Sequence, residues 1–274
     1  MDFPRLLKRP GLVFFGILLL AGALRFYNLT GHAIWYDEAH SVIKASLESK
    51  PLISTINSQK ESFQPPLYYF TLFVWGSVFG SSLFSIRALS ALLSLLTVPF
   101  LYLSVKRLFN RSTAFLTILI YALSPFQIWY AQEARLYALS CLLATLAFYF
   151  FTRFHKSPGT KSYLLTAFSL LLCFLSNYFA CVLIVFFFLY SVIRQRRFLY
   201  HPYVILFCVF LVSLFFILIK DQLGYVFTHS WIGETAMTTA PIALANLFIG
   251  FNGSKTLFYF SIPFLCILFV LGLG

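Results

Sequence analysis

The stretch 86-IRALSALLSLLTVPFLYLSV-105, which runs into Lys106-Arg107, decides the class of this protein. It carries a single charge, and about 20 predominantly apolar residues of helix are needed to cross the hydrocarbon core of a bilayer. A helix is required because an open sheet would leave backbone groups unpaired in lipid. The stretch therefore predicts a transmembrane helix with a basic end.

Further apolar runs predict membrane-crossing helices at 11–29, 112–128, 135–152, 162–177, 178–194, 202–220 and 255–273. The composition agrees, since 60% of the 274 residues are hydrophobic and 10% are charged, against about 25% charged in a soluble domain. So few charges cannot form a water-facing surface over most of the protein. We predict an all-α polytopic membrane protein.

The basic residues predict how the chain lies in the membrane. Twelve of the twenty lysines and arginines fall in short segments that alternate with the spans: Arg5, Lys8, Arg9, Lys106, Arg107, Arg111, Arg153, Lys156, Lys161, Arg194, Arg196 and Arg197. One acid, Asp2, accompanies them, whereas the other segments carry eight basic and seven acidic residues. Short cytoplasmic loops are enriched in Lys and Arg, so we expect a cytoplasmic N-terminus in the cell (plasma or inner) membrane. The orientation of the chain in the membrane therefore explains the net charge of +12. Nucleic-acid binding would instead require a basic patch in polar surroundings.

The same rule constrains the aromatic run 66–80. Span 11–29 ends outside and span 86–105 begins outside, so a crossing between them would invert every later basic loop. The run opens with Pro65-Pro66, and proline favours the first turn of a helix. We expect an interfacial or re-entrant helix, with a true span as the alternative.

The outer loop 25–65 is the most polar part of the chain and predicts an amphipathic helix over 37–48. At 100° per residue its polar face carries Asp37, Ser41, Lys44 and Glu48, with His40 about 60° away. Such a helix would lie flat on the membrane. Glu38 falls about 100° round from Asp37, at the edge of that face. Alternatively, Asp37 only caps the helix and Glu38 only favours its positive terminus.

A second polar segment, 124–137, is predicted on the same side of the membrane. Its Glu133 and Arg135 lie at the mouth of a span, where ionisable groups are costly and either pair or serve a function. A structural Glu–Arg pair is the alternative. Ser176-Asn177-Tyr178 is a third, weaker outer feature, for which a plain turn between two spans is the favoured alternative.

The sequence predicts no cofactor. The five cysteines lie in apolar runs without a CxxC spacing, which favours small buried residues over a metal or redox site. The sequence also contains neither of two common nucleotide-binding motifs, a Walker A motif or a Gly-x-Gly-x-x-Gly at a strand–helix turn. A divalent metal ion cannot be inferred from the sequence, although the Glu133 carboxylate could serve as a ligand for one.

Short segments carry an ordered likeness to a known family: 24-LRFYNL-29, 35-WYDEA-39, 64-QPPLYY-69, 87-RALSAL-92, 107-RLF-109, 124-SPF-126 and 133-EARLYA-138. Together they resemble the dolichyl-phosphate-mannose-protein mannosyltransferase-like proteins. These are GT-C superfamily glycosyltransferases (glycosyltransferase family 39), to which the aminoarabinose transferases of lipid A modification are related. The step 176-SNY-178 is similar to the family's Thr-His-Tyr.

The resemblance implies a GT-C-type transmembrane helical module, 1–274, with juxtamembrane helices in the first outer loop. The family's C-terminal region is not matched, and we expect that it is missing. The implied reaction moves a sugar from a polyprenyl-phosphate donor to a lipid, glycan or protein acceptor on the extracytoplasmic face. Asp37 would be the base, with Glu38 beside it as a catalytic residue. The expected substrate-binding residues are His40, Lys44, Gln64, Tyr68, Glu133, Arg135, Tyr137 and Tyr178. Gln64 departs from relatives that have Lys or His there, so this position lacks a cation for the donor phosphate.

The chemistry fits these residue types. A carboxylate within hydrogen-bond reach can take the proton of an acceptor hydroxyl as it attacks the sugar C1. A fixed cation, Arg135 or Lys44, can stabilise the leaving phosphate. With one base and no separate nucleophile, we expect inversion at C1. A transporter or flippase for a lipid-linked saccharide is the alternative, and would place ionisable residues near the midplane. A non-catalytic scaffold of an envelope complex is a third possibility.

Overall fold

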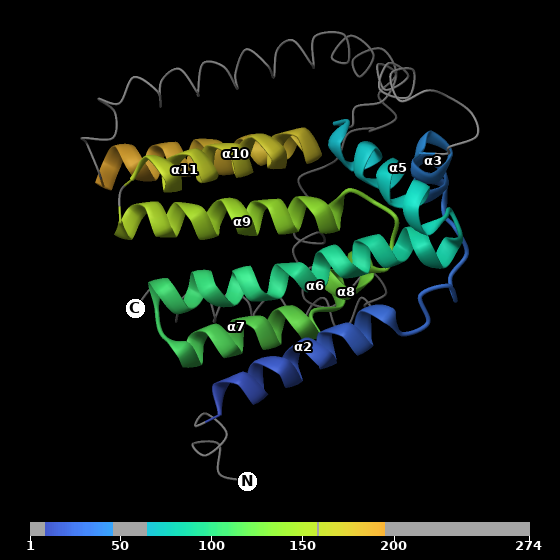
Figure 1. Ribbon diagram of the computed structural model, residues 1–274, viewed down its shortest axis with the longest axis horizontal. Helices are drawn as coiled ribbons and strands as arrows, with labels where there is room; N and C mark the ends of the chain where they lie inside the picture. The colour runs from blue at the N-terminus through green and yellow to red at the C-terminus, as the bar shows by residue number, and fades with distance from the viewer. Residues whose placement is uncertain (1–8, 46–64, 158, 195–274) are drawn as a thin grey trace, which may run out of the picture.

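The computed structural model describes residues 9–45, 65–157 and 159–194 (Figure 1). Every regular element in these ranges is a helix, so the predicted all-α class is confirmed. The elements are α2 (Pro10–Phe26), α3 (Tyr36–Ala45), α5 (Leu67–Phe79), α6 (Leu83–Leu108), α7 (Arg111–Leu123), α8 (Pro125–Ala131), α9 (Tyr137–Lys156), α10 (Thr160–Ser176), the 3₁₀ turn η2 (Tyr178–Ala180) and α11 (Cys181–Arg194). The predicted spans 202–220 and 255–273 lie outside the described residues.

The longer helices lie side by side in a bundle, and two shorter ones gather at one end of it (Figure 1). Helix α6 is central and contacts α2, α7 and α9, while α10 packs on α9 and α11 packs on α10. Helices α3 and α5 lie together at the right-hand end of Figure 1, where α5 also contacts α6 and α10. This end of the bundle brings the polar segments of the chain together.

Several helices have the length and composition of membrane spans. In the described part of the chain, α6 with 26 residues and α9 with 20 are long and apolar enough to cross, and the bent pair α7 and α8 adds a third if it counts as one span. Helices α2 and α10 are apolar but shorter, at 17 residues each. These lengths agree with the predicted multi-pass membrane protein.

Small residues allow the helices to approach closely. Ala21, Ala91, Ala114 and Ala122 are completely buried. Membrane helices favour such residues at their contacts because close backbones gain van der Waals packing. Large apolar side chains face outward instead, among them Leu12, Phe15, Leu19, Leu116, Ile120 and Phe168. An outward surface of this kind suits lipid as its solvent.

The predicted span 112–128 is not one straight helix, because the chain bends at Ser124-Pro125. Helices α7 and α8 meet there at an angle of 59°. Ser124 caps α8 by accepting a hydrogen bond from the Gln127 N–H at 3.4 Å, and Pro125 opens that helix. Proline has no N–H to donate to the carbonyl four residues earlier, so the last turn of α7 loses a hydrogen bond.

Arg25 supplies the hydrogen bonds that the break removes. Its guanidinium, which is completely buried, donates to the carbonyls of Tyr121 and Ala122 at 3.2 Å each. Its Nε donates to Ser94 Oγ on α6 at 2.8 Å. The C-terminal carbonyls of a helix carry partial negative charge and attract a cation. Arg25 therefore joins α2 to the ends of α7 and α6.

Gln132 makes the complementary contact from the other side. Its amide Nε2, just after α8, donates to the carbonyls of Leu24 at 3.2 Å and Tyr27 at 2.9 Å. These carbonyls lie at the C-terminal end of α2, where helical partners run out. Each helix end is thus capped by a side chain from the other, which fixes the position of the loop 132–136.

Helix α5 replaces the expected run 66–80 and has 13 residues. At 1.5 Å per residue it is roughly 20 Å long, too short for a hydrocarbon core of about 30 Å. It ends at Gly80, whose φ of 79° is available to glycine at little cost. This length is compatible with the interfacial or re-entrant helix that we expected.

Helix α3 was expected to turn its polar face to water, and the structure shows this only in part. The Asp37 side chain is 42% exposed, but Ser41 on the same face is completely buried and Ile43 is 68% exposed. Asp37 and Ser41 contact Arg135 of the loop 132–136, and Glu38 at the edge of the face contacts Arg87 of α6. Periodicity identified the helix but could not identify buried charged partners so far along the chain. Residues 46–48 of the predicted helix lie outside the described residues.

Candidate active site

A buried ion pair attaches α3 to α6. Glu38 and Arg87 meet through two hydrogen bonds, Nε to Oε1 at 2.8 Å and NH2 to Oε2 at 2.6 Å. Glu38 is completely buried and Arg87 is 2% exposed. Glu38 was expected at the edge of a water-facing surface, so the structure corrects its surroundings. A buried carboxylate of this kind needs its partner, because an uncompensated buried charge is strongly destabilising.

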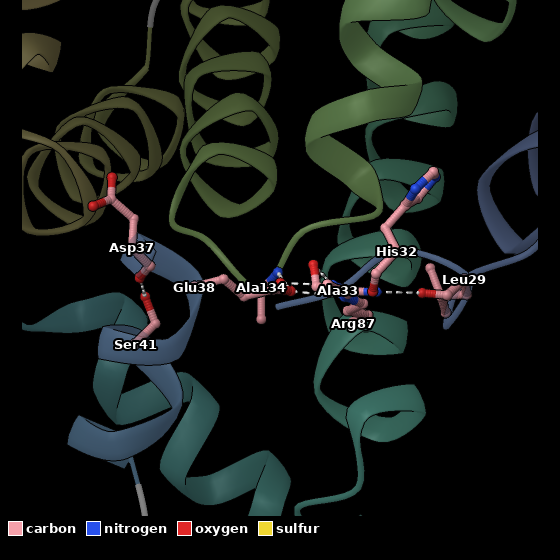
Figure 2. A network of polar contacts seen from close by, with 8 residues as sticks. All are labelled: Leu29, His32, Ala33, Asp37, Glu38, Ser41, Arg87 and Ala134. Atoms are coloured by element: carbon pink, nitrogen blue, oxygen red, sulfur yellow. Dashed lines mark hydrogen bonds and ion pairs between the residues drawn. The ribbon is translucent and has the colours of Figure 1, made fainter. Parts of the chain in front are cut away.

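Arg87 uses every N–H that it has (Figure 2). Besides Glu38, its NH1 donates to the carbonyls of Leu29 and His32 at 2.9 and 3.0 Å. Its NH2 donates to the Ala33 carbonyl at 3.4 Å. A guanidinium has five N–H donors. Arg87 therefore holds the segment 29–33 in place and has no donor left for a substrate.

Glu38 also fixes the loop between α8 and α9. Its Oε1 accepts a hydrogen bond from the Ala134 N–H at 2.9 Å. The loop 132–136 is thereby joined to α3, although the two residues are 96 positions apart. This contact orients the side chains on either side of Ala134, which are Glu133 and Arg135.

A second ion pair lies beside the first and is more open. Arg135 NH2 lies 3.2 Å from Asp37 Oδ2, and its NH1 donates to the Asp37 carbonyl at 3.0 Å and to Ser41 Oγ at 3.2 Å. The Asp37 side chain is 42% exposed, whereas that of Arg135 is 4% exposed. Figure 2 shows the Asp37 carboxylate pointing away from Glu38. Neighbouring residues of a helix face different directions, so the two acids have different surroundings.

Glu133 is a buried acid with an unused oxygen. The residue is 7% exposed, and its Oε2 has no hydrogen-bond partner among the described residues. Burial raises the pKa of Glu133 to about 7, against the opposing effect of a hydrogen bond with the Trp129 side chain. Nearby Glu38 adds to the increase, while Arg135 and Arg87 oppose it. In the described ranges the ion pair of Arg135 is made with Asp37, so the Glu133–Arg135 pair considered from the sequence is not formed.

A cavity of about 490 Å³ opens beside Glu38 and Glu133. It is lined by His32, Ala33, Trp35, Glu38, Arg87, Trp129, Tyr130, Gln132 and Glu133. Pockets for small molecules usually measure roughly 300 to 1,000 Å³ and combine aromatic walls with a few polar groups. Asp37 and Arg135 are not part of this lining. The hollow and the open ion pair are thus two distinct features on either side of the Glu38–Arg87 contact.

The other predicted site residues are distributed unevenly. Tyr137 packs on Tyr130, with ring centroids 4.2 Å apart, and lies 5.8 Å from the Arg135 guanidinium. Tyr68 is buried, and its hydroxyl has no hydrogen-bond partner among the described residues. Tyr178 packs on Phe174 inside the bundle, and His40 is exposed on α3. The Lys44 side chain and Gln64 lie outside what the structure describes. No cluster of three or more His, Cys, Asp or Glu suited to a metal occurs in the described ranges.

Sequence reasoning missed Arg25, Arg87, Gln132 and the tryptophans of the cavity as members of one site. One signal was available, since Arg25 and Arg87 lie at the outer ends of predicted spans, where ionisable residues tend to be paired. Their partners could not be named, because Arg87 and Glu38 are 49 positions apart and the carbonyl partners of Arg25 have no side-chain signature.

Comparison with known proteins bears on residues 63–220. These residues match the family model described as dolichyl-phosphate-mannose-protein mannosyltransferase. The matched region covers more than half of the chain and includes Arg87 and the loop 132–136. No curated protein matches the chain significantly.

Proposed function

Since the chain belongs to the dolichyl-phosphate-mannose-protein mannosyltransferase family and is therefore a membrane glycosyltransferase of the GT-C type, we propose that it transfers a sugar from a polyprenyl-phosphate carrier to an acceptor hydroxyl. The family description names a lipid-phosphate donor, a mannose and a protein acceptor. A donor anchored in the bilayer suits an enzyme whose site lies at one end of a helical bundle.

Asp37 is the base in this proposal, and one observation carries the assignment. Of the two adjacent acids, Asp37 alone combines an accessible carboxylate, 42% exposed, with a cation at 3.2 Å. Glu38 is completely buried, and its oxygens are occupied by Arg87 and by the Ala134 N–H. A general base must reach the proton that it removes. Glu38 is accordingly a positioning residue, which departs from the catalytic role that we first expected for it.

In the proposed reaction, sugar transfer is a single displacement at C1. The acceptor hydroxyl oxygen attacks the sugar C1, and the bond between C1 and the phosphate oxygen breaks with its electron pair leaving on the phosphate. The hydroxyl proton passes to Asp37, and the products are the glycosylated acceptor and polyprenyl phosphate. Attack opposite the leaving group inverts C1. Asp37 later returns its proton to water.

Arg135 is the proposed contact for the leaving phosphate. It is the cation nearest the Asp37 carboxylate among the described residues, and its Nε has no hydrogen-bond partner there. Arginine forks match phosphate oxygens well, and a fixed cation stabilises charge that develops in the transition state. Arg87 cannot take this role because all its donors are occupied within the protein.

We propose further that the site faces the non-cytoplasmic side. Lys156 Nζ donates to the Arg107 carbonyl, so the basic turns 106–111 and 153–157 meet. These turns join α6 to α7 and α9 to α10, whereas the loop 132–136 joins the opposite ends of α8 and α9. Basic turns mark the cytoplasmic side of a membrane protein. Asp37 would then be reached from the outer surface.

Replacement of Asp37 by Asn tests the proposal. In phospholipid nanodiscs supplied with polyprenyl-phosphate mannose and a peptide or glycan acceptor, we expect turnover to fall by about 10²- to 10⁴-fold. Tyr36→Phe is the matched control, because Tyr36 is 84% exposed on the same helix and makes no contact used in the proposal. Full turnover of Asp37→Asn would remove the base assignment. Vesicle uptake of a saccharide without any transfer would favour a transporter instead.

A further inference from the structure

The cavity beside Glu133 has the size and shape of a binding site that the proposed chemistry at Asp37 does not use. Its volume is about 490 Å³, and residues from the segment 32–35, α3, α6, α8 and the loop 132–136 surround it. Hydrogen bonds hold these segments together, either to Arg87 and Glu38 or, through Gln132, to the end of α2. The cavity is therefore preformed.

Aromatic side chains form much of its wall. Trp35 is 45% exposed and Trp129 is 41% exposed, and the His32 ring lies 6.1 Å from that of Trp129. Indoles offer wide apolar faces together with a polar edge. Flat faces of this kind match the C–H face of a pyranose ring, whose hydroxyl groups remain free to meet polar groups around it.

The polar groups of the cavity favour a ligand that carries hydroxyls. Glu133 Oε2 is buried and has no hydrogen-bond partner in the described part of the chain, although Glu133 lines the hollow. Buried polar atoms in native structures nearly always have a partner, so an orphan in a cavity wall indicates a missing one. Either form of a carboxyl group accepts a hydrogen bond from a hydroxyl.

An anionic ligand is disfavoured by the same wall. Arg87 lines the cavity, but its five N–H groups are spent on Glu38 and on the carbonyls of residues 29–33. Glu38 and Glu133 contribute negative charge or acceptor oxygens at the same surface. A phosphate or a uronic acid would meet two acids and no arginine donor that is still available, so its desolvation would be poorly compensated.

We propose that this cavity binds an uncharged sugar ring, stacked on Trp35 and Trp129 and hydrogen-bonded to Glu133. The inference rests on the proposed function for its role, because the ring would belong either to the donor or to a glycan acceptor. The binding itself does not depend on Asp37.

Saturation-transfer NMR in nanodiscs free of glycoside detergent measures this binding directly. With methyl α-D-mannopyranoside as probe, Glu133→Leu and Trp129→Ala are each expected to weaken binding by about tenfold. Glu133→Gln retains a carbonyl acceptor and should bind within about threefold of wild type. Phe109→Ala is the control, since Phe109 is 69% exposed at the end of α6 joined to the basic turn. Methyl α-D-glucuronide should bind at least about tenfold more weakly than the mannoside.

Equal binding by wild type and Glu133→Leu would overturn the proposal, as would tighter binding of the glucuronide. Unfolding midpoints of all variants identify any that fail to fold, and Glu133→Gln then carries the comparison with Trp129→Ala. Asp37→Asn separates the two proposals, because it should lose transfer and keep mannoside binding. An active Asp37→Asn with Glu133-dependent binding would refute only the base. In transfer assays, a higher KM for the acceptor or for the donor in Glu133→Leu identifies which sugar occupies the cavity.

Discussion

Arg87 and Arg135 both receive an acid of α3, but the protein uses their donors differently. Arg87 donates all five N–H groups to Glu38 and to backbone carbonyls, and Glu38 is completely buried. Arg135 pairs with a half-exposed Asp37 and retains an unpartnered Nε within the described residues. The saturated pair builds the geometry, and the unsaturated pair is available for chemistry. Two successive residues of one helix thus serve different purposes because they face different neighbours.

Removing the saturated arginine should have the largest effect. Arg87→Met leaves the Glu38 carboxylate buried without its cation, and such a change costs about 3–5 kcal/mol. We expect a large fall in the unfolding midpoint, measured in micelles, together with loss of transfer. The double variant Glu38→Gln/Arg87→Met should recover part of the stability because no unpaired charge remains. An Arg87→Met protein as stable as wild type would contradict the comparison.

Removing the unsaturated arginine should separate activity from stability. Arg135→Met is expected to lower turnover by about 10²- to 10³-fold, as for other groups that stabilise developing charge. Its stability should fall by about 1–3 kcal/mol, less than for Arg87→Met, because buried Ser41 and the Asp37 carbonyl lose their donor but the carboxylate left unpaired is half-exposed. Arg135→Lys keeps the charge but not the fork and should be intermediate. Turnover and unfolding midpoint measured on the same samples decide the matter, and a stability loss equal to that of Arg87→Met would erase the distinction.

Arg25 sharpens the comparison because it is buried without an acid. Its partners are Ser94 and the carbonyls at the end of α7, so Arg25→Met leaves unsatisfied oxygens but no unpaired charge. We expect a loss of about 1–3 kcal/mol, smaller than for Arg87→Met. Chemical unfolding of both variants under one condition gives the order. Equal losses would show that the acid partner of Arg87 contributes nothing special.

The last test of the comparison concerns the pH dependence of stability at Glu133. Burial raises the pKa of Glu133 to about 7 in the folded protein, against about 4.3 in an unfolded chain. Between these values the unfolded chain releases a proton that the folded protein keeps, so stability falls as pH rises through this window. Glu133→Gln has no proton to lose and should show a smaller drop in unfolding midpoint from pH 5 to pH 8. Identical drops in the two proteins would place the pKa of Glu133 in its ordinary range.

Much of the fold could be read from local sequence. Hydropathy predicts the span 86–105, which lies within the observed helix α6. Periodicity predicts the helix over 37–48, and the first part of that prediction corresponds to the observed helix α3. The nearness of Asp37 and Arg135 followed from placing both segments on one side of the membrane. The distribution of Lys and Arg predicts the side on which a loop lies, because short cytoplasmic loops are enriched in these residues.

The parts that could not be predicted depend on packing between distant segments. The helical wheel separated Asp37 from Glu38 but could not say which would be buried, because that depends on Arg87, 49 positions away. The break before Pro125 carries a signal in the sequence, but the run 112–128 is predominantly apolar and contains no charged residue, so it is predicted as a single span. The cavity between Trp35 and Trp129 exists only after three segments meet, so no single stretch of sequence encodes it.

The mutual capping of α2 and the α7–α8 bend has a consequence for the first helix. An unrelated hydrophobic segment in place of α2 would hold the chain in the bilayer equally well, but it would leave the Tyr121 and Ala122 carbonyls without their donors and Gln132 without its acceptors. Helix α2 is therefore a structural part of the end of the bundle that carries the candidate active site.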